Sequence, residues 1–231
     1  MKILYEDNHV LCLVKPPNMP VNSDSSNDPD LLTAARTYIG EKYHKPGNVY
    51  IGLVHRLDRP VGGVMVFART SKAASRLSDA IRKNQMEKEY MAILDGVPKK
   101  NQDTLTDYLV KDEKTNTSRV TDAAHGKKCV LSYEVLAVCN RKTLVKIHLE
   151  TGRSHQIRVQ FSSRGLPLVN DQRYHSSPAK GQIALWAYFL SFPHPTLKTP
   201  VVIQELPDFT KAPWSLFKEF ADEEDKKKNQ I

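Results

Sequence analysis

One carboxylate lies between two arginines in the stretch HRLDRPVGG, residues 55–63. Arg56 precedes Asp58 by two residues, Arg59 follows it directly, and the proline and two glycines that come next predict a tight turn. A carboxylate flanked by guanidinium groups is usually one half of a surface ion pair. The other interpretation is a catalytic carboxylate displayed on a turn, since carboxylates serve as nucleophiles and bases. By itself the stretch favours the ion pair.

A second group of polar residues lies in LETGRSHQIRVQF, residues 149–161. Five of six consecutive positions have polar side chains, namely Arg153, Ser154, His155, Gln156 and Arg158. Guanidinium groups bind carboxylates and phosphates because their planar fork donates two parallel hydrogen bonds. A solvated helix end with arginines placed by chance fits this stretch equally well.

A third candidate is Tyr90, in the stretch MEKEYMAIL, residues 86–94. Its neighbours predict a strand, and a tyrosine in such a strand is most often a half-buried core residue. Tyr90 therefore gains a functional interpretation only together with the other two stretches.

The elements that must position these residues follow from the spacing of apolar side chains. Strands are predicted from the first residues of the chain and over 9–16, 48–57, 63–70, 87–96 and 145–150. Helices are predicted over 30–40, ending at Gly40, over 71–83, and over 154–164, with Ser154 as cap and Gly165 beyond the end. The strand predicted over 48–57, directly before the turn, would point the side chains of Arg56 and Asp58 to the same side. The last helix would place His155 and Arg158 on one face.

Strands outnumber helices and rarely alternate with them one for one. This order predicts an α+β fold, a mostly antiparallel mixed sheet with flanking helices. No Gly/Ser linker divides the chain. We predict one domain over 1–215, followed by a C-terminal helix end and charged tail over 216–231.

The composition of the chain indicates which kinds of partner, metal and cofactor are expected. The 34 lysines and arginines against 26 acidic residues give a formal net charge of +8, which favours a polyanionic partner. The eight histidines have no ligand spacing such as HExxH, so no metal is expected. The sequence has no Gly-rich phosphate-binding loop, so no cofactor is expected either. Three cysteines without a CxxC motif predict reduced thiols in the cytoplasm. No apolar stretch approaches the length of a membrane span.

The three stretches are specific when they are taken together and in order: HRLD before a Gly-containing turn, K-x-Y-x-A around Tyr90, and TGR-x-HQIR. With them the chain resembles the RluA-type family of RNA pseudouridine synthases. ILYEDNHVLCLVKPPNMPV (3–21) is similar to the opening strands of that family, and GLPLVNDQRY (165–174) and LWAYFLSFPHP (185–195) are similar to its closing segment. The resemblance extends from about Ile3 to Leu206.

The chain departs from the family pattern in two places. Many members have Thr-Ser-Gly where this chain has Val61-Gly62-Gly63, so a polar contact through the missing hydroxyl is not expected. Many members also have a small basic S4 domain before the catalytic domain, and Asp58 lies too near the N-terminus of this sequence for one to fit. RNA affinity is then expected to come from the catalytic domain itself.

The resemblance implies the pseudouridine synthase catalytic fold and the isomerisation of uridine in ribosomal or transfer RNA. The N-glycosidic bond breaks, the uracil turns, and C5 joins C1′, with no cofactor. Asp58 matches the catalytic carboxylate of the family, Arg158 its ion-pair partner, and Tyr90 the residue that lies against the uracil. Attack of Asp58 on C1′ and removal of a proton from C2′ both remain open.

The resemblance also implies that the target nucleotide leaves the base stack, since Asp58 cannot reach it there. Arg56 matches the residue that fills the vacated space. The residues predicted to bind the substrate RNA are His55, Arg56, Arg153, His155 and Gln156. RNA is the expected partner, without a membrane, and the chain is expected to be a cytoplasmic monomer.

Two other classes of protein fit parts of the sequence. A non-catalytic RNA-binding scaffold would be marked by loss of Asp58 or Arg158, and both are present. An unrelated acid–base hydrolase of glycosides or nucleosides would require a second carboxylate in a comparable sequence environment, and the sequence contains no convincing one. The synthase is the preferred interpretation.

Overall fold

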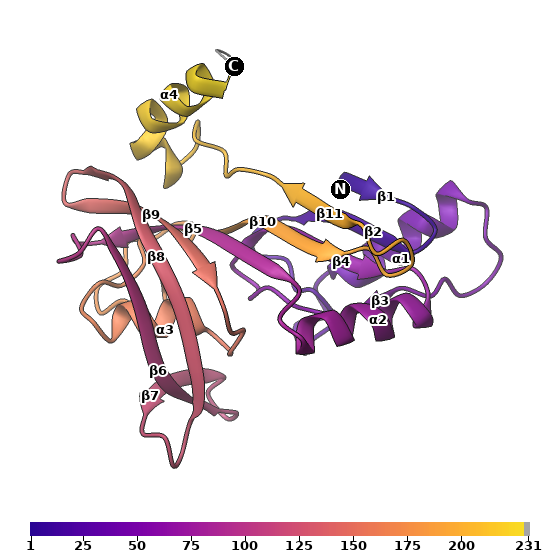
Figure 1. Cartoon of the computed structure of the whole chain (residues 1–231), viewed down its shortest axis with the longest axis horizontal. Helices are drawn as coiled ribbons and strands as arrows, with labels where there is room; N and C mark the ends of the chain where they lie inside the picture. Colours follow the sequence, from indigo (N-terminus) through magenta and orange to yellow (C-terminus); the bar gives the residue numbers. More distant parts are fainter. Residues whose placement is uncertain (229–231) are drawn as a thin grey trace. The chain divides into compact units, whose positions relative to one another are not determined.

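The computed structural model describes residues 1–228, and its elements form two compact units. Unit 1 consists of Met1–Lys88 with Ala187–Glu205, and unit 2 consists of Glu89–Trp186 with the residues from Leu206 onward. Strands and helices occur in both units, and the strand pairings described below are antiparallel (Figure 1). The predicted α+β fold with a mostly antiparallel sheet is thereby confirmed.

Unit 1 is built on a sheet with the strand order β1-β2-β4-β10, with β3 paired to β4 and β11 to β10. The strands are β1 (Lys2–Glu6), β2 (Val10–Lys15), β3 (Gly52–Leu53), β4 (Gly62–Ala68), β10 (Leu185–Pro193) and β11 (Pro200–Gln204). In the antiparallel pair β2–β4, Val10 lies opposite Ala68 and Lys15 lies opposite Gly63. The end of β2 therefore lies beside the start of β4, directly after the stretch that contains Asp58.

Two helices belong to unit 1, α1 (Leu31–Lys42) and α2 (Ser71–Arg82). The helix predicted over 71–83 is confirmed, and its buried residues are Ala73, Leu77 and Ala80. Ala73 and Leu77 belong to a core cluster that also contains Val64 and Val66 of β4. Thr70 caps this helix by accepting a hydrogen bond from the backbone N–H of Ala73 at 3.1 Å.

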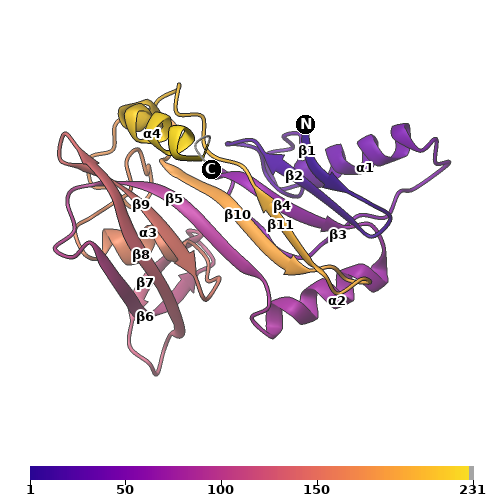
Figure 2. The ribbon, with the colours of Figure 1, turned by 45° about the horizontal axis from the view of Figure 1, so that its top comes forward.

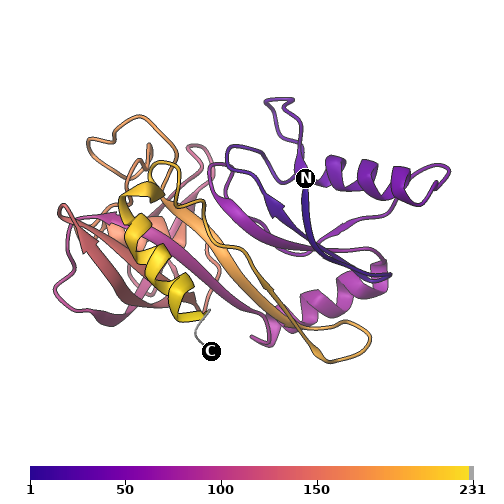
Figure 3. The ribbon, with the colours of Figure 1, turned by 90° about the horizontal axis from the view of Figure 1, so that it is seen from above.

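Helix α1 is the violet helix to the right of the N-terminus in Figure 3. It does not end at Gly40 as predicted but continues to Lys42. A glycine inside a helix costs about 1 kcal/mol relative to alanine. Glu6 on β1 offsets this cost, since its carboxylate accepts hydrogen bonds from Lys42 and from the hydroxyls of Tyr38 and Tyr43 at 2.7 to 2.9 Å.

Unit 2 contains the strand order β5-β9-β8-β6-β7 (Figure 2). Its elements are β5 (Glu87–Asp95), β6 (Gln102–Asp112), β7 (Thr117–Thr121), β8 (Lys127–Cys139), β9 (Lys142–Leu149), α3 (Gln156–Ser162), the 3-10 helix η1 (Trp214–Phe217) and α4 (Lys218–Lys228). The strand predicted over 145–150 corresponds to the second half of β9, in which Val145 and Ile147 are fully buried while Lys146 and His148 are only partly covered.

All three cysteines are free thiols, in agreement with the sequence-based expectation. No helix within residues 1–228 is both long and apolar enough to cross a membrane. Residues 229–231 of the predicted charged tail lie outside the described residues. The predicted domain boundary at residue 215 stays a prediction.

Candidate active site

Asp58 begins a tight turn in unit 1. The backbone N–H of Val61 donates to the carbonyl oxygen of Asp58 at 2.9 Å, so Arg59 and Pro60 are the central residues. The strand predicted over 48–57 is much shorter than expected, since β3 covers only Gly52–Leu53 and the residues that follow it are irregular. Strand alternation therefore no longer argues that Arg56 and Asp58 point to the same side.

The two glycines after the turn belong to β4. Gly63 has φ +129, and a Cβ atom built there would lie 2.1 Å from the carbonyl oxygen of Ala187 on β10. No side chain fits, so glycine is required for the close approach of the two strands. This packing fixes the backbone immediately after the Asp58 turn.

Arg59 is held by the loop before α1. Its guanidinium binds the carboxylates of Asp24, at 3.4 Å, and Asp28, and it donates to the hydroxyl of Ser26 at 3.0 Å. The surface ion pairs of Arg59 are therefore formed with Asp24 and Asp28 of this loop.

Lys15 lies fully buried beneath the turn. Its ammonium group donates to the carbonyl oxygens of Pro16 and Arg59, both at 2.9 Å. Burial lowers the pKa of Lys15 from 10.5 to about 7, and the nearby carboxylate of Asp58 opposes this shift. Sequence reasoning missed Lys15, although a lysine that ends the apolar run of β2 was a signal.

The burial of Lys15 predicts how pH affects stability. Between pH 7 and the ordinary pKa of 10.5 the unfolded chain binds a proton that the folded chain does not. The free energy of unfolding of the wild type should therefore rise with pH there, relative to Lys15→Met, by up to about 1.4 kcal/mol per pH unit.

Urea unfolding of both proteins at pH 7, 8.5 and 10 measures this difference. Lys72→Met is the matched control, because Lys72 is exposed on α2 and should give a difference from wild type that does not vary with pH. Parallel stability profiles for the wild type and Lys15→Met would contradict the lowered pKa of Lys15.

His55 anchors the stretch before Asp58 to β4. Its Nε2 accepts a hydrogen bond from the backbone N–H of Val66 at 3.1 Å. Burial, with a smaller effect of Lys88, lowers the pKa of His55 to about 3, so the imidazole is neutral at physiological pH. His55 thus positions the turn, while Arg56 next to it is exposed.

In unit 2, Arg158 on α3 forms a two-point ion pair with Asp171. Arg158 Nε lies 2.9 Å from Asp171 Oδ2, and Nη2 lies 2.7 Å from Oδ1. Both side chains are buried. Burial alone would raise the pKa of Asp171, but the guanidinium and two backbone N–H groups hold it below its ordinary value.

Asp171 was missed by sequence reasoning. Its segment, NDQRY, was singled out for its resemblance, but no residue in it was selected. The spacing between Arg158 and Asp171 follows no helix or strand period, so only the tertiary fold pairs them.

The helix predicted over 154–164 is shorter than expected. Its cap is His155, not Ser154, and His155 adopts a left-handed conformation with φ 55 and ψ 22. The side-chain amide of Gln156 holds the residues that precede the helix. Its oxygen accepts hydrogen bonds from the hydroxyl of Thr151 at 2.8 Å and from the backbone N–H of Arg153 at 3.1 Å.

The other candidates of unit 2 have the following environments. The amide nitrogen of Gln156 donates to the carbonyl of Val130 and to Gln160, so the group is bound within the fold. Arg153 is exposed and donates through Nε to the carbonyl of Lys128 at 3.1 Å. Tyr90 is buried on β5 opposite Ile147, which agrees with its interpretation as a core residue.

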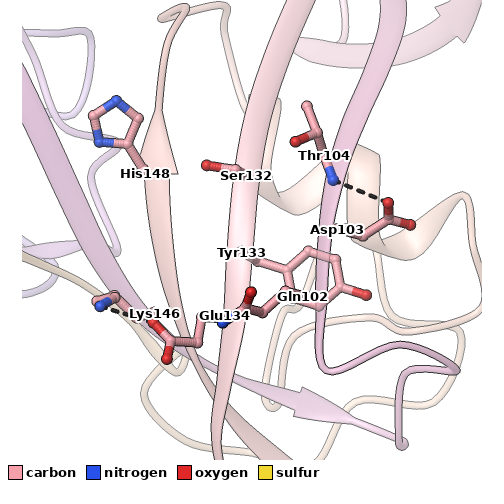
Figure 4. A pocket seen from close by; sticks show the side chains of 8 residues that line it. All are labelled: Gln102, Asp103, Thr104, Ser132, Tyr133, Glu134, Lys146 and His148. Carbon is pink, nitrogen blue, oxygen red and sulfur yellow. Dashed lines mark hydrogen bonds and ion pairs between the residues drawn. The ribbon is translucent and has the colours of Figure 1, made fainter.

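An open polar pocket of about 500 Å³ lies elsewhere in unit 2, over β6, β8 and β9 (Figure 4). It is lined by Gln102, Asp103, Thr104, Ser132, Tyr133, Glu134, Lys146 and His148. Lys146 is paired with Glu134 at 2.9 Å, and Asp103 accepts from the backbone N–H of Thr104 at 3.0 Å. Within the described chain this lining includes none of the predicted site residues. Nor do the described residues contain a group of three side chains suited to a metal ion.

Comparison with known proteins identifies relatives. Residues 9–163 match the family model for RNA pseudouridylate synthase. An uncharacterised RNA pseudouridine synthase of Zymomonas mobilis is 34% identical over 179 residues, which cover 76% of this chain and 78% of the relative. Ribosomal large subunit pseudouridine synthase D of Yersinia pestis is 35% identical over 184 residues, which cover 77% of this chain and 54% of the relative.

Solved structures show the same fold. The human RNA pseudouridylate synthase domain containing 4 superposes with a TM-score of 0.78 and 20% identity, over 95% of this chain and 92% of that chain. The human RNA pseudouridylate synthase domain containing 1 gives a TM-score of 0.72 and 20% identity, over 92% of this chain and 85% of that chain. The predicted catalytic fold is thereby confirmed.

Proposed function

The chain belongs to the RNA pseudouridylate synthase family, an isomerase family that converts uridine to pseudouridine in RNA, and on this premise we propose that Asp58 performs the reaction in this chain. The observation that supports Asp58 most directly is its placement on a turn held from below by the buried Lys15. His55 holds the residues before the turn, and Gly63 fixes those after it. Such fixed positioning is what a reaction at one sugar atom requires.

The carboxylate of Asp58 acts at the ribose of the target uridine. In its ionised form it either attacks C1′ as a nucleophile or takes the proton from C2′. Both routes release the uracil, which turns and forms the C5–C1′ bond. In the first route this bond replaces the Asp58–C1′ bond, and in the second Asp58 returns its proton to C2′. The C5 proton is then lost to a base while N1 gains a proton, so no proton is gained or lost overall. Reactant and product are isomers, so no redox partner or transferred group is needed.

Arg158 is assigned as the partner of the Asp58 carboxylate. Asp171 binds Nε and Nη2 of this guanidinium and so fixes its plane. A guanidinium has five N–H donors, so one that binds a first carboxylate can also bind a second. Tyr90 is assigned to contact the uracil and is the candidate base for the C5 proton.

The five residues predicted to bind RNA divide into two groups by their environments. Arg56 and Arg153 are exposed and are assigned to direct contact with RNA. His55, His155 and Gln156 have hydrogen bonds within the fold and are assigned to shaping the site around the reacting residues. The net charge of +8 adds a general attraction for RNA phosphates.

Arg56→Ala should separate base flipping from chemistry. Its proposed role is to fill the space left by the flipped uridine, so the variant should lose about tenfold more activity on a structured stem-loop than on a single-stranded oligonucleotide with the same target, equivalent to about 1.4 kcal/mol of flipping cost. Single-turnover pseudouridine formation on both substrates measures this, with Arg36→Ala, exposed on α1, as control. Equal losses on the two substrates would assign Arg56 to the fold or the chemistry instead.

The names of the relatives favour ribosomal RNA of the large subunit as the substrate over transfer RNA. We propose this substrate, a cytoplasmic location and a monomeric enzyme. Mapping pseudouridines in total RNA from cells with and without the gene identifies the RNA and the modified uridine.

The purified wild type tests the activity itself. With RNA labelled with tritium at uridine C5, we expect tritium release without any added metal or nucleotide. Tight binding of the physiological RNA with no release would overturn the enzyme assignment and favour the non-catalytic scaffold.

A further inference from the structure

The hydroxyl of Tyr174 joins two parts of unit 2 that are far apart in sequence. It accepts a hydrogen bond from the backbone N–H of Ser118 on β7 at 2.8 Å, and it lies 2.6 Å from Nδ1 of His155. The ring of Tyr174 meets His155 edge to face and lies 5.0 Å from the guanidinium carbon of Arg158. One tyrosine therefore touches two of the residues predicted for the site.

The protonation of His155 determines which atom donates in this contact. The hydroxyl of Tyr174 accepts from the backbone N–H of Ser118, and it has one hydrogen to donate and room for a second donor. When the neutral imidazole has its hydrogen on Nε2, Nδ1 accepts the hydroxyl hydrogen across the contact of 2.6 Å. If Nδ1 were protonated, it would donate to the hydroxyl, and the phenol hydrogen would need another acceptor.

The segment around Tyr174 is itself fixed. Asp171 Oδ1 accepts from the backbone N–H groups of Arg173, at 3.0 Å, and Tyr174, at 3.2 Å. The guanidinium of Arg173 donates to the carbonyl oxygens of Thr115, at 3.0 Å, and Asn116, in the turn between β6 and β7. Residues 171–174 thus connect this turn to Arg158 and His155.

His155 needs such support because of its backbone. At φ 55 it lies in the left-handed region, which only a few per cent of non-glycine residues adopt, although His does so more often than most. The side chain of His155 is buried, and the contact with Tyr174 fixes its ring in that conformation.

We propose that Tyr174 is a positioning residue of this site, which holds His155 as its Nε2–H tautomer and supports the guanidinium of Arg158 with its ring. The inference rests on the proposed function, since Arg158 and His155 matter to catalysis only if this site modifies RNA. Tyr174 itself contacts neither RNA nor the reacting atoms in this assignment. It acts through His155.

Tyr174→Phe tests the hydroxyl while it retains the ring. Nitrogen-15 NMR of the RNA-free protein should show the wild-type His155 as one tautomer with a protonated Nε2, and the variant should shift toward a mixture of both. Tyr133→Phe is the matched control. Tyr133 also packs on α3, through Phe161 at 5.4 Å, but its hydroxyl donates to the carbonyl of Lys100, so its removal should leave the His155 signals unchanged.

Kinetics distinguish positioning from stability. Tyr174→Phe should slow single-turnover pseudouridine formation about tenfold, the effect of one lost hydrogen bond, with less than about a twofold change in RNA affinity. Tyr133→Phe should retain the wild-type rate after correction for the folded fraction.

A third variant tests whether Tyr174 acts through His155. His155→Gly keeps the left-handed backbone at no steric cost and removes the imidazole. In that background, adding Tyr174→Phe should slow the reaction less than about twofold, because the two residues form one unit.

An equal effect of Tyr174→Phe with and without the imidazole would overturn the inference. A wild-type His155 protonated on Nδ1 would do so as well. Failure of the proposed function is recognised separately. A wild type that forms no pseudouridine contradicts the proposed function, whereas the NMR measurement of the His155 tautomer does not depend on activity.

Discussion

Asp58→Asn should leave the protein folded and bound to RNA but unable to form pseudouridine. The amide nearly preserves the shape of the carboxylate, and loss of a negative charge near phosphates does not weaken RNA binding. A neutral amide can neither attack C1′ nor accept the proton of C2′. We expect the single-turnover rate to fall by at least about 10⁴-fold, as for other catalytic carboxylates and nucleophiles.

Tritium release from uridine labelled at C5 measures the rate, and filter retention measures RNA binding in parallel. Asp79→Asn is the matched control, since Asp79 is an exposed carboxylate on α2 that pairs with Arg82 and Lys83. It removes the same charge from the same unit and should retain the wild-type rate. Undiminished release by Asp58→Asn would refute the assignment of Asp58.

The second large effect is expected at Arg158. Arg158→Met removes one partner of a buried ion pair and leaves the fully buried carboxylate of Asp171 without its guanidinium. Removal of one partner from such a pair typically destabilises a protein by about 3–5 kcal/mol. An inactive Arg158→Met protein therefore cannot by itself distinguish lost chemistry from lost folding.

The double variant Arg158→Met with Asp171→Asn separates the two effects. The asparagine oxygen can still accept from the backbone N–H groups of Arg173 and Tyr174, and no buried charge remains. We expect the double variant to recover most of the free energy of unfolding, as replaced buried ion pairs often do. It should nevertheless form no pseudouridine, because Asp58 lacks its assigned partner.

Urea unfolding and single-turnover assays at equal folded fractions measure these two effects. Arg164→Met is the control, because Arg164 pairs with Asp107 near the surface and its loss should cost about 1 kcal/mol or less. Activity of the stabilised double variant near the wild-type level would remove Arg158 from the catalytic assignment.

Local patterns in the sequence were sufficient for much of the fold. The alternation in β9 and the helical spacing of Ala73, Leu77 and Ala80 in α2 correspond to buried faces. Burial of apolar side chains is the main contribution to the stability of these segments, and the spacing of apolar residues along the sequence shows which face is buried. The segments that differ from the prediction, residues 54–57 and the start of α3, are held by side-chain hydrogen bonds to distant parts of the chain.

The sequence by itself was sufficient for the family, for several of the elements and for the candidate residues Asp58, Tyr90 and Arg158, because short motifs and the local spacing of apolar residues indicate these. Only the tertiary structure decided which groups support them. Lys15 lies 44 residues from the carbonyl of Arg59 that it binds, and Tyr174 lies 56 residues from the amide of Ser118. Such contacts follow no local period, since they depend on strands that pair and bury polar groups together, and a buried polar group requires a partner wherever the fold provides one.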